Sequence, residues 1–372
     1  MKKRGAYAGV ATIALVFVFG YSNLSEIEYR SENFDKPERF IPLPELDKAD
    51  YNARILALAH VSSTTQTFFT ATTSVWVTST ASTTSTSSGQ ASSSQTTTNS
   101  LWPVSTVYPN AGAILPFKRV VAYYGNFYSR GMGVLGEYPE DEMLAMLAST
   151  TEMWTAADPG TPALPAIHYI AVVAQATAGK EGKYLLRMPD DQIDHALTLA
   201  KRINGIVFLD VQVGLSTLQY ELPFLEKYLK MPEVHLGIDP EFSMKSGNRP
   251  GTVIGTFDAA DINYAAEYLA RIVRENHIPP KILVVHRFTQ KMMTNYKEIK
   301  PLPEVQIVID MDGFGSKAKK YGTYNRVVAP EPVQFTGMKL FYKNDIRPPA
   351  DGLLSPAEVL KLIPAPIYIQ YQ

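Results

Sequence analysis

The sequence predicts an α/β fold in which residues 118–372 form a (β/α)8 TIM barrel. The first observation is a set of eight short apolar runs rich in Val, Ile and Leu, which is typical of parallel strands buried on both faces. The second is the helical spacing of apolar residues between the runs, which supplies the crossovers that parallel pairing requires. The third is the polar residue that ends each run, because barrel sites lie at the C-terminal ends of the strands.

The eight strands are expected to begin near Arg119, Pro165, Gly205, Val234, Lys281, Val305, Val333 and Ala365. Helices are expected over 139–156, 190–203, 217–229 and 258–276, with weaker patterns over 290–299, 316–327 and 355–362. Asp258 and Ser216 are the expected N-caps of two of them. No helix follows the last strand, so the barrel closes by pairing of the first and last strands, or a helix near Asp47 fills the gap.

Composition excludes several classes of protein. The chain is 45% hydrophobic and 19% charged, as globular domains are, and its formal net charge of −1 argues against nucleic acid as a partner. There is no cysteine, which excludes disulfides, zinc-thiolate sites and thiol nucleophiles. No cofactor is indicated.

The first 25 residues have the pattern of an export signal. Lys2, Lys3 and Arg4 precede an uncharged stretch from Gly5 to Ser25. This stretch fits either a signal peptide cut after Ser22 or an uncleaved membrane anchor, since a span needs about 20 residues. We therefore expect an extracellular or cell-surface protein that meets the membrane only through this segment.

Two further segments precede the expected barrel. Residues 26–61 resemble a spacer, with one amphipathic helix predicted over Asp47–Val61. Residues 62–117 contain no charged side chain, and 26 of the 39 residues from Ser62 to Ser100 are Ser or Thr. Such a composition predicts a flexible stalk, either a glycosylated extracellular spacer or a passive linker.

Three strand exits carry pairs of polar residues two positions apart: Asp210 with Gln212, Asp239 with Glu241, and Asp310 with Asp312. Residues two apart on a strand share a face, so each pair is expected to point into one mouth of the barrel. The remaining exits add Tyr123 or Tyr124, Gln175, His286 with Arg287, Lys339 and Gln370. The sequence thus predicts an acidic cluster at the C-terminal mouth.

Glycosidic cleavage requires one carboxyl group as acid and another as base or nucleophile. The catalytic candidates are Glu241, Asp239, Asp310 and Asp312. Expected substrate-binding residues are Asp210, Gln212, Tyr124, His286, Lys339 and Gln370. A single one of these aspartates is also explained as a helix cap, and Lys339 as a partner that neutralises Asp310. The whole set favours a function, because burying so many like charges is costly.

Other chemistries remain open at this cluster. The acidic residues fit a non-catalytic module that binds a sugar or a cation, including Ca²⁺ or Mg²⁺ held by Asp210, Asp239, Glu241 and Asp310. They also fit a metal-dependent phosphodiesterase that uses His286. That histidine is otherwise a donor to a sugar hydroxyl or a core residue, whereas His168, His195, His235 and His277 are expected to have no catalytic part. No HExxH or GxSxG motif occurs, and no metal ligand is assigned.

The strands ending in Asp239 and Asp310 are fourth and sixth in the expected barrel. With about 4.8 Å between neighbouring strands, their exits begin about 10 Å apart. Carboxyl groups that end about 6.5–9.5 Å apart suit an inverting mechanism, which this starting distance slightly favours.

The segments FLDVQVG, GIDPEF, VVHRFT, VIDMDGFG and MKLFY resemble those of exported bacterial TIM-barrel proteins of uncharacterised activity that look like glycosidases. The similarity runs from about Val120 to Gln372. GIDPE is also distantly similar to the fourth-strand DGxDxDxE motif of chitinase-like glycosidases, although Pro240 departs from its spacing. That likeness implies that Glu241 is the acid of a glycan hydrolase.

Overall fold

The computed structural model describes residue 43, residues 45–61 and residues 107–372. The predicted export signal and Ser62–Ser100 lie outside these residues. No helix in the described part of the chain is long and apolar enough to cross a membrane.

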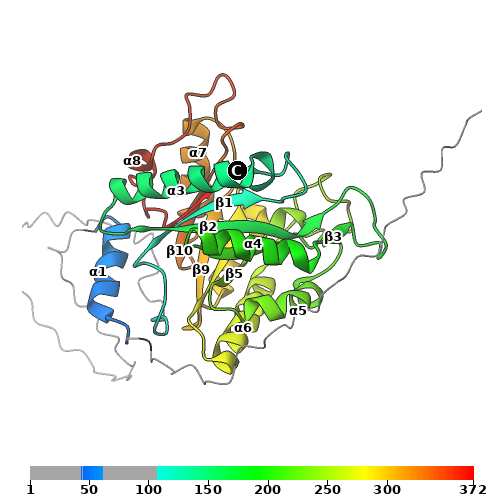
Figure 1. Cartoon of the computed structure of the whole chain (residues 1–372), viewed down its shortest axis with the longest axis horizontal. Helices are drawn as coiled ribbons and strands as arrows, with labels where there is room; N and C mark the ends of the chain where they lie inside the picture. The colour runs from blue at the N-terminus through cyan, green and yellow to red at the C-terminus, as the bar shows by residue number, and fades with distance from the viewer. Residues whose placement is uncertain (1–42, 44, 62–106) are drawn as a thin grey trace, which may run out of the picture. The chain divides into compact units, whose positions relative to one another are not determined.

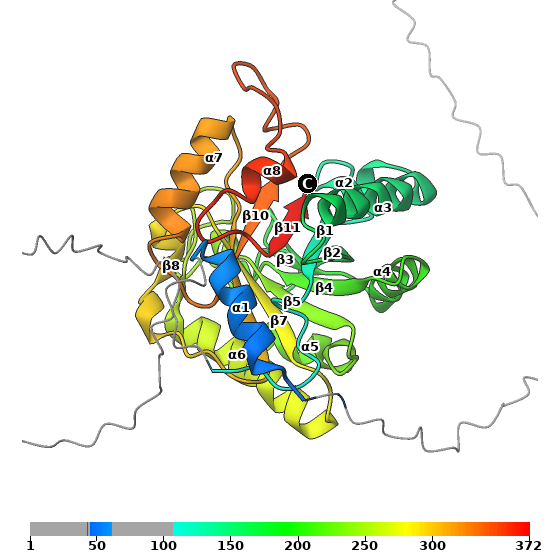
Figure 2. The same ribbon diagram turned by 90° about the vertical axis from the view of Figure 1, so that its left-hand side faces the viewer.

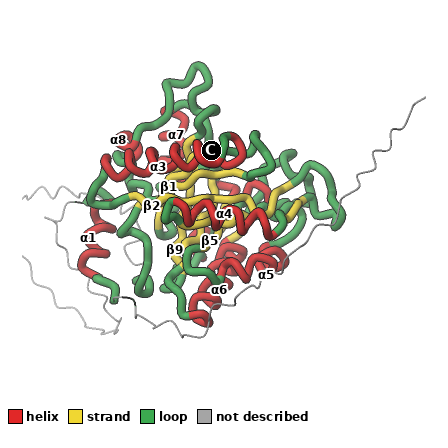
Figure 3. Tube along the Cα trace, in the orientation of Figure 1, coloured by secondary structure: helices red, strands yellow, loops and turns green. Residues whose placement is uncertain are grey.

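Eight parallel strands form a closed barrel (Figures 1 and 3). They are β1 (Arg119–Gly125), β2 (Ala163–Ala174), β4 (Ile206–Val211), β5 (Val234–Ile238), β7 (Lys281–Arg287), β9 (Val305–Met311), β10 (Phe335–Leu340) and β11 (Tyr368–Tyr371). β1 pairs with both β2 and β11, so the first and last strands close the sheet. The predicted TIM-barrel architecture is therefore confirmed.

Helices connect the successive barrel strands except β7 and β9. They are α2 (Val134–Glu137), α3 (Glu140–Ala157), α4 (Asp190–Arg202), α5 (Leu218–Leu229), α6 (Ala259–Asn276), α7 (Lys317–Thr323) and α8 (Pro356–Val359). The last turn of α7 continues as a π-helical turn over Tyr324–Val328. These elements confirm the helical spacing in all predicted segments except 290–299.

Residues 290–299 do not form the expected helix. Two 3₁₀ turns, Gln290–Met292 and Tyr296–Glu298, flank the short strand β8 (Met293–Thr294), which pairs with β6 (Phe257–Asp258). Asn295 has a φ of +56°, which interrupts any helix there. The buried Arg287 side chain donates to Gln290 O and Met293 O. The pairing of β8 with β6 joins segments distant in sequence, so a tertiary contact overrides the local helical pattern.

The helix caps agree with expectation at one of two positions. Asp258 caps α6 through a capping box with Asp261. The cap of α5 is Thr217 rather than Ser216, since the Thr217 hydroxyl accepts a hydrogen bond from Tyr220 N. The backbone N–H of Ser216 is instead bonded to Val213 O in the preceding turn.

A short antiparallel strand, β3 (Leu185–Arg187), extends one edge of β2 beyond the barrel. Gln175, predicted as a mouth residue, donates its backbone N–H to Tyr184 O in the connection between these strands. It does not line the cavity described below.

The predicted N-terminal helix is α1 (Lys48–Leu58), capped by the Asp47 side chain. It does not replace an eighth barrel helix. Instead it lies across the N-terminal end of the barrel, in front of the strands in Figure 2, with Tyr51 and Leu58 packed into the barrel interior. Leu58 O accepts from Ala365 N, and Arg54 donates to Gly160 O.

The compact unit also begins earlier than the expected boundary at Lys118. Leu115 is fully buried, and Gln306 in β9 accepts hydrogen bonds from both Ile114 N and Leu115 N. Residues 107–117 therefore belong to the packed domain, because a buried side chain holds their backbone.

The barrel interior changes from apolar to polar along its axis. Near the N-terminal end, inward positions include Val120, Phe208, Val284 and Val308, which pack with α1. Two residues further along the same strands, Asp210, His286 and Asp310 take the corresponding positions. Since residues two apart share a face, β4, β7 and β9 each carry an apolar and then a polar residue on the inner side, whereas in β1 Ala122 follows Val120.

Candidate functional site

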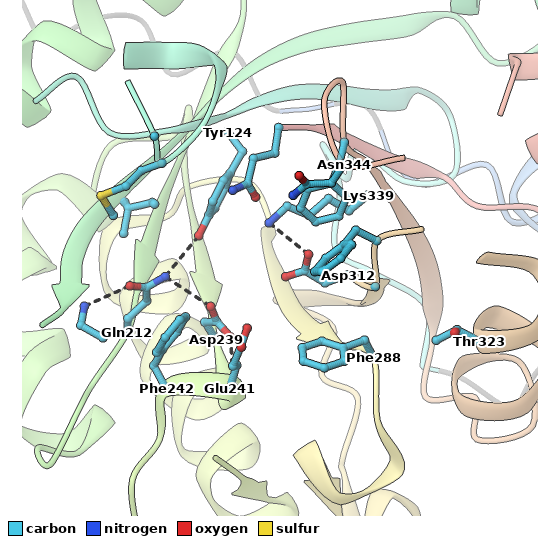
Figure 4. A pocket seen from close by; sticks show the side chains of 18 of the residues that line it. Tyr124, Gln212, Asp239, Glu241, Phe242, Phe288, Asp312, Thr323, Lys339 and Asn344 are labelled. Carbon is cyan, nitrogen blue, oxygen red and sulfur yellow. Dashed lines mark hydrogen bonds and ion pairs between the residues drawn. The ribbon is translucent and has the colours of Figure 1, made fainter. Parts of the chain in front are cut away.

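A cavity of about 550 Å³ opens at the C-terminal mouth of the barrel (Figure 4). We call it the mouth cavity. Polar and charged residues that line it are Tyr124, Gln212, Asp239, Glu241, Asp312, Lys319, Thr323, Lys339, Asn344 and Gln372. Its apolar lining includes Met132, Ile170, Phe242, Phe288, Phe314 and Phe341. The volume is within the range of small-molecule sites.

The polar pairs predicted at strand exits divide between two depths. Gln212 and Asp312 line the mouth cavity, whereas Asp210 and Asp310, two residues earlier, are fully buried and do not. Asp239 and Glu241 both line it. The sequence pattern thus predicted the correct side of each strand, and the position along the barrel axis decides which residue reaches solvent.

The local structure after β5 explains why both Asp239 and Glu241 reach the cavity. The strand ends at Ile238, and Pro240–Phe242 form a 3₁₀ turn. Asp239 caps this turn, since its Oδ1 accepts from Glu241 N at 3.0 Å. The turn replaces the expected strand geometry and carries Glu241 to the cavity wall.

Gln212 joins the two sides of this wall. Its Nε2 donates to Asp239 Oδ2 at 3.3 Å and to the Tyr124 hydroxyl at 3.4 Å (Figure 4). Its Oε1 accepts from Ala174 N at 3.0 Å, which fixes the orientation of the amide. Tyr124 in turn donates to Asp210 Oδ2 at 3.0 Å.

Lys339 pairs with Asp312 rather than with Asp310. Its Nζ lies 3.1 Å from Asp312 Oδ1 and 3.8 Å from the centre of the Tyr124 ring. The parallel register of β9 and β10 explains the choice, because Asp310 lies beside Gly337, two residues before Lys339. The sequence expectation of a Lys339–Asp310 pair is corrected accordingly.

The three carboxyl groups of the mouth cavity have different proton affinities. Burial, with a contribution from Asp312, raises the pKa of Glu241 to about 6. Burial likewise raises the pKa of Asp239 well above its usual value. For Asp312, burial opposes ionisation, but the charges of Lys339 and His286 outweigh it and lower the pKa. The cavity therefore combines a proton-holding carboxyl group with an ionised one.

Below the mouth cavity lies a second group of polar side chains, which we call the buried cluster: His168, Asp210, His286 and Asp310. All four are fully buried. Asp210 Oδ1 lies 3.3 Å from both His168 Nε2 and His286 Nε2. His286 Nδ1 lies 3.4 Å from Asp310 Oδ2 and 3.2 Å from Asp312 Oδ2.

Sequence reasoning missed His168, which was expected to have no part in the site. It lies within the apolar run of β2, and its Nδ1 is 2.6 Å from the Tyr368 hydroxyl. Gln370 also faces this cluster and donates to Tyr368 at 2.8 Å rather than lining the cavity. A titratable residue in an otherwise apolar inner strand was the one signal that pointed to His168.

Burial and neighbouring charges act in opposite directions on the buried cluster. Burial lowers the pKa of His168 to about 4, more than Asp210 raises it. Burial also opposes the charging of His286, but Asp210, Asp310 and Asp312 outweigh it and raise its pKa well above the usual value. Burial raises the pKa of Asp310, while for Asp210 the two histidines outweigh burial and lower it.

Fold and site together define a TIM-barrel protein with an acid-rich, aromatic-lined cavity at the C-terminal ends of the barrel strands. No protein-family model matches the chain, and a search of curated proteins finds no match. The activity is therefore argued from the cavity itself.

Proposed function

We propose that this protein is a glycoside hydrolase that acts on an extracellular or cell-surface glycan. The observation that carries the proposal is the presence of Asp239, Glu241 and Asp312 in one mouth cavity. Cleavage of a glycosidic bond by carboxyl groups alone requires an acid that holds a proton and a second group that is ionised. Glu241 and Asp312 have these opposite properties.

In this proposal Glu241 protonates the leaving oxygen of the sugar. Asp312, kept ionised by Lys339, acts as the base that activates water. Asp310 has no part in the reaction, because it does not line the cavity. Asp239 is hydrogen-bonded to Gln212 and to Glu241 N, so it orients the cavity wall. β7 separates the strands that carry Asp239 and Asp312, as the inverting arrangement assumes.

The lining of the cavity favours a neutral sugar over a phosphodiester. Three carboxyl groups face two lysines, and Lys339 is already paired with Asp312. An anionic substrate would meet this negative charge, whereas sugar hydroxyls bond readily to carboxylate and amide groups. Four phenylalanine rings, those of Phe242, Phe288, Phe314 and Phe341, line the cavity and are of the kind against which sugar rings pack.

A screen of reducing sugars released from cell-wall and extracellular glycans tests the proposal. On a glycan that the wild type cleaves, Glu241→Gln should lower kcat about 10²–10⁴-fold and retain glycan binding, because it removes the transferable proton but keeps the size of the side chain. Asp312→Asn should have a similar effect. Glu267→Gln on the exposed face of α6 is the matched control and should leave turnover unchanged.

Two outcomes contradict the proposal. Near-normal turnover by Glu241→Gln removes this residue as the acid. Binding of a glycan by the wild type without any release of sugar would instead favour a carbohydrate-binding module on the same cavity.

A further inference from the structure

We propose that His168, Asp210 and His286 form a binding site for a zinc-type divalent metal ion inside the barrel. These residues come from β2, β4 and β7, and none of them lines the mouth cavity. The inference goes beyond the proposed glycan hydrolysis, which uses Glu241 and Asp312. It rests on three atoms that converge within the protein interior.

The first argument is that these three atoms have no hydrogen bond. They are His168 Nε2, Asp210 Oδ1 and His286 Nε2, each buried without a hydrogen-bond partner. Buried polar atoms are almost always hydrogen-bonded, so three unsatisfied atoms at one point need an explanation. All three lie within 4.8 Å of one another, so one ion can contact them together.

The second argument is the spacing of these atoms. Asp210 Oδ1 is 3.3 Å from each of the two imidazole nitrogens. Zinc binds His nitrogen and carboxylate oxygen at about 2.0–2.2 Å in tetrahedral geometry, which puts neighbouring ligand atoms about 3.3–3.5 Å apart. Octahedral coordination at the same bond lengths brings them closer, to about 2.8–3.1 Å. The two separations from Asp210 Oδ1 match the tetrahedral value, and the third pair of atoms lies within 4.8 Å.

The third argument is the outer shell of hydrogen-bonding groups. His168 Nδ1 contacts the Tyr368 hydroxyl at 2.6 Å, and Asp210 Oδ2 accepts from Tyr124 at 3.0 Å. His286 Nδ1 faces the carboxylates of Asp310 and Asp312. Metal-binding histidines usually hold a carboxylate or another polar group at the second nitrogen, which fixes the ring and its tautomer. His168 and Asp210 thus have their other polar atom hydrogen-bonded, and the other nitrogen of His286 lies within 3.4 Å of two carboxylates without forming a hydrogen bond.

The fourth argument is the space left by Gly237 in β5, the strand between β4 and β7. Asp210 and Gly237 are register partners. A Cβ atom at Gly237 would lie 2.4 Å from both Asp210 Oδ1 and His168 Nε2. The absence of a side chain at Gly237 therefore lets two of the three ligand atoms lie close to the β5 backbone, where any Cβ would displace them.

The competing explanation is that His286 carries a proton and is itself the cation between Asp210 and Asp310. Metal analysis distinguishes a bound metal ion from a protonated His286. Wild-type protein is stripped with a chelator, dialysed against ZnCl₂ or CoCl₂, and measured for metal content and visible absorption. We expect one zinc per chain, a cobalt form with the absorption of tetrahedral coordination, and a higher Tm with zinc. Folded wild type that takes up no zinc overturns the proposal.

Variants identify the ligands. His168→Ala and Gly237→Ala should abolish zinc binding, the second because its methyl group crowds the ligand atoms. Tyr368→Phe removes only the hydroxyl that contacts His168, keeps the ring, and should weaken zinc binding about 10–100-fold. It serves as the ligand test if the other two variants fail to fold. His195→Ala on the surface of α4 is the matched control and should keep full zinc content.

These measurements stay separate from the test of hydrolysis. Glu241→Gln should lose turnover yet retain one zinc per chain, since it contributes none of the three atoms. Zinc binding without glycan hydrolysis would leave the metal site standing while the proposed function fails. Full zinc content in folded His168→Ala, or unchanged affinity in Tyr368→Phe, would contradict the metal site.

Discussion

Glu241 differs from the other carboxylates of the mouth cavity in its exposure. Asp239 and Asp312 keep only 3% and 9% of their surface, whereas Glu241 is half-buried on a 3₁₀ turn. It is therefore the acid that a substrate can reach most easily, and its pKa of about 6 lets it hold a proton in mildly acidic solution. Its exposure and its pKa thus distinguish Glu241 from Asp239 and Asp312.

The raised pKa of Glu241 predicts the pH dependence of activity. A group that must be protonated to act loses its proton as the pH rises through about 6, so kcat/KM should fall above that pH. A profile on a verified glycan checks this. The residual activity of the Glu241→Gln variant should show no decrease above pH 6. A wild-type kcat/KM that instead rises through pH 6 would contradict the acid role.

The same shift predicts an effect on stability. Because the folded-state pKa lies above the unfolded value of about 4.5, neutral Glu241 contributes stability that is fully present below pH 4.5 and lost as the pH rises through about 6. Denaturant unfolding of wild type and Glu241→Gln across this window measures it. The difference in unfolding free energy between the two proteins should change with pH only between about 4.5 and 6.

At the scale of elements, α1 serves the barrel by covering its N-terminal end. Tyr51 is 2% exposed and packs edge-to-face on Tyr108, while Arg54 lies over the ring of Phe117. The helix therefore shields the apolar half of the barrel interior from water. Its distance in sequence from the first barrel strand does not weaken this role, since lengthening a connection adds little entropy cost.

Replacement of Tyr51 by Ala should destabilise the whole domain. Truncation of a buried large aromatic side chain costs about 3–5 kcal/mol of unfolding free energy. Leu56→Ala on the same helix is the control, because Leu56 is 37% exposed, and it should change stability by about 0.5 kcal/mol or less. Denaturant titration measures both. Equal effects would mean that α1 does not pack on the barrel as described.

At the scale of the whole molecule, barrel closure joins the two ends of the folded unit. β11 pairs with β10 on one side and with β1 on the other. It also carries Tyr368, which contacts His168, and Tyr371, which accepts from Trp154 of α3 at 2.9 Å. The last strand therefore stabilises the sheet, the buried cluster and a surrounding helix together.

Deletion of residues 368–372 should open the barrel and abolish cooperative unfolding, because β1 and β10 would both have an unpaired edge. Circular dichroism and thermal unfolding test this. Deletion of residues 1–42 is the control, since Leu43–Gln372 form one compact unit, and it should leave the transition intact. A cooperative transition in the C-terminally truncated chain would contradict the role given to β11.

The sequence alone determined the strands, most helices and the acidic character of the mouth. Strand and helix periodicity are local properties, and each polar strand exit could be read from a few neighbouring residues such as Asp239 and Glu241. The loop at 290–299 was mispredicted because pairing of β8 with the distant strand β6, together with hydrogen bonds from the Arg287 side chain, fixes its backbone.

Only the tertiary structure decided how deep each polar residue lies. Periodicity assigns Asp310 and Asp312 to the inner face, but their positions along the barrel axis place Asp310 in the buried cluster and Asp312 in the mouth cavity. The approach of His168, Asp210 and His286 likewise depends on three strands distant in sequence and on the space at Gly237. Such contacts arise from barrel closure, which no local pattern encodes.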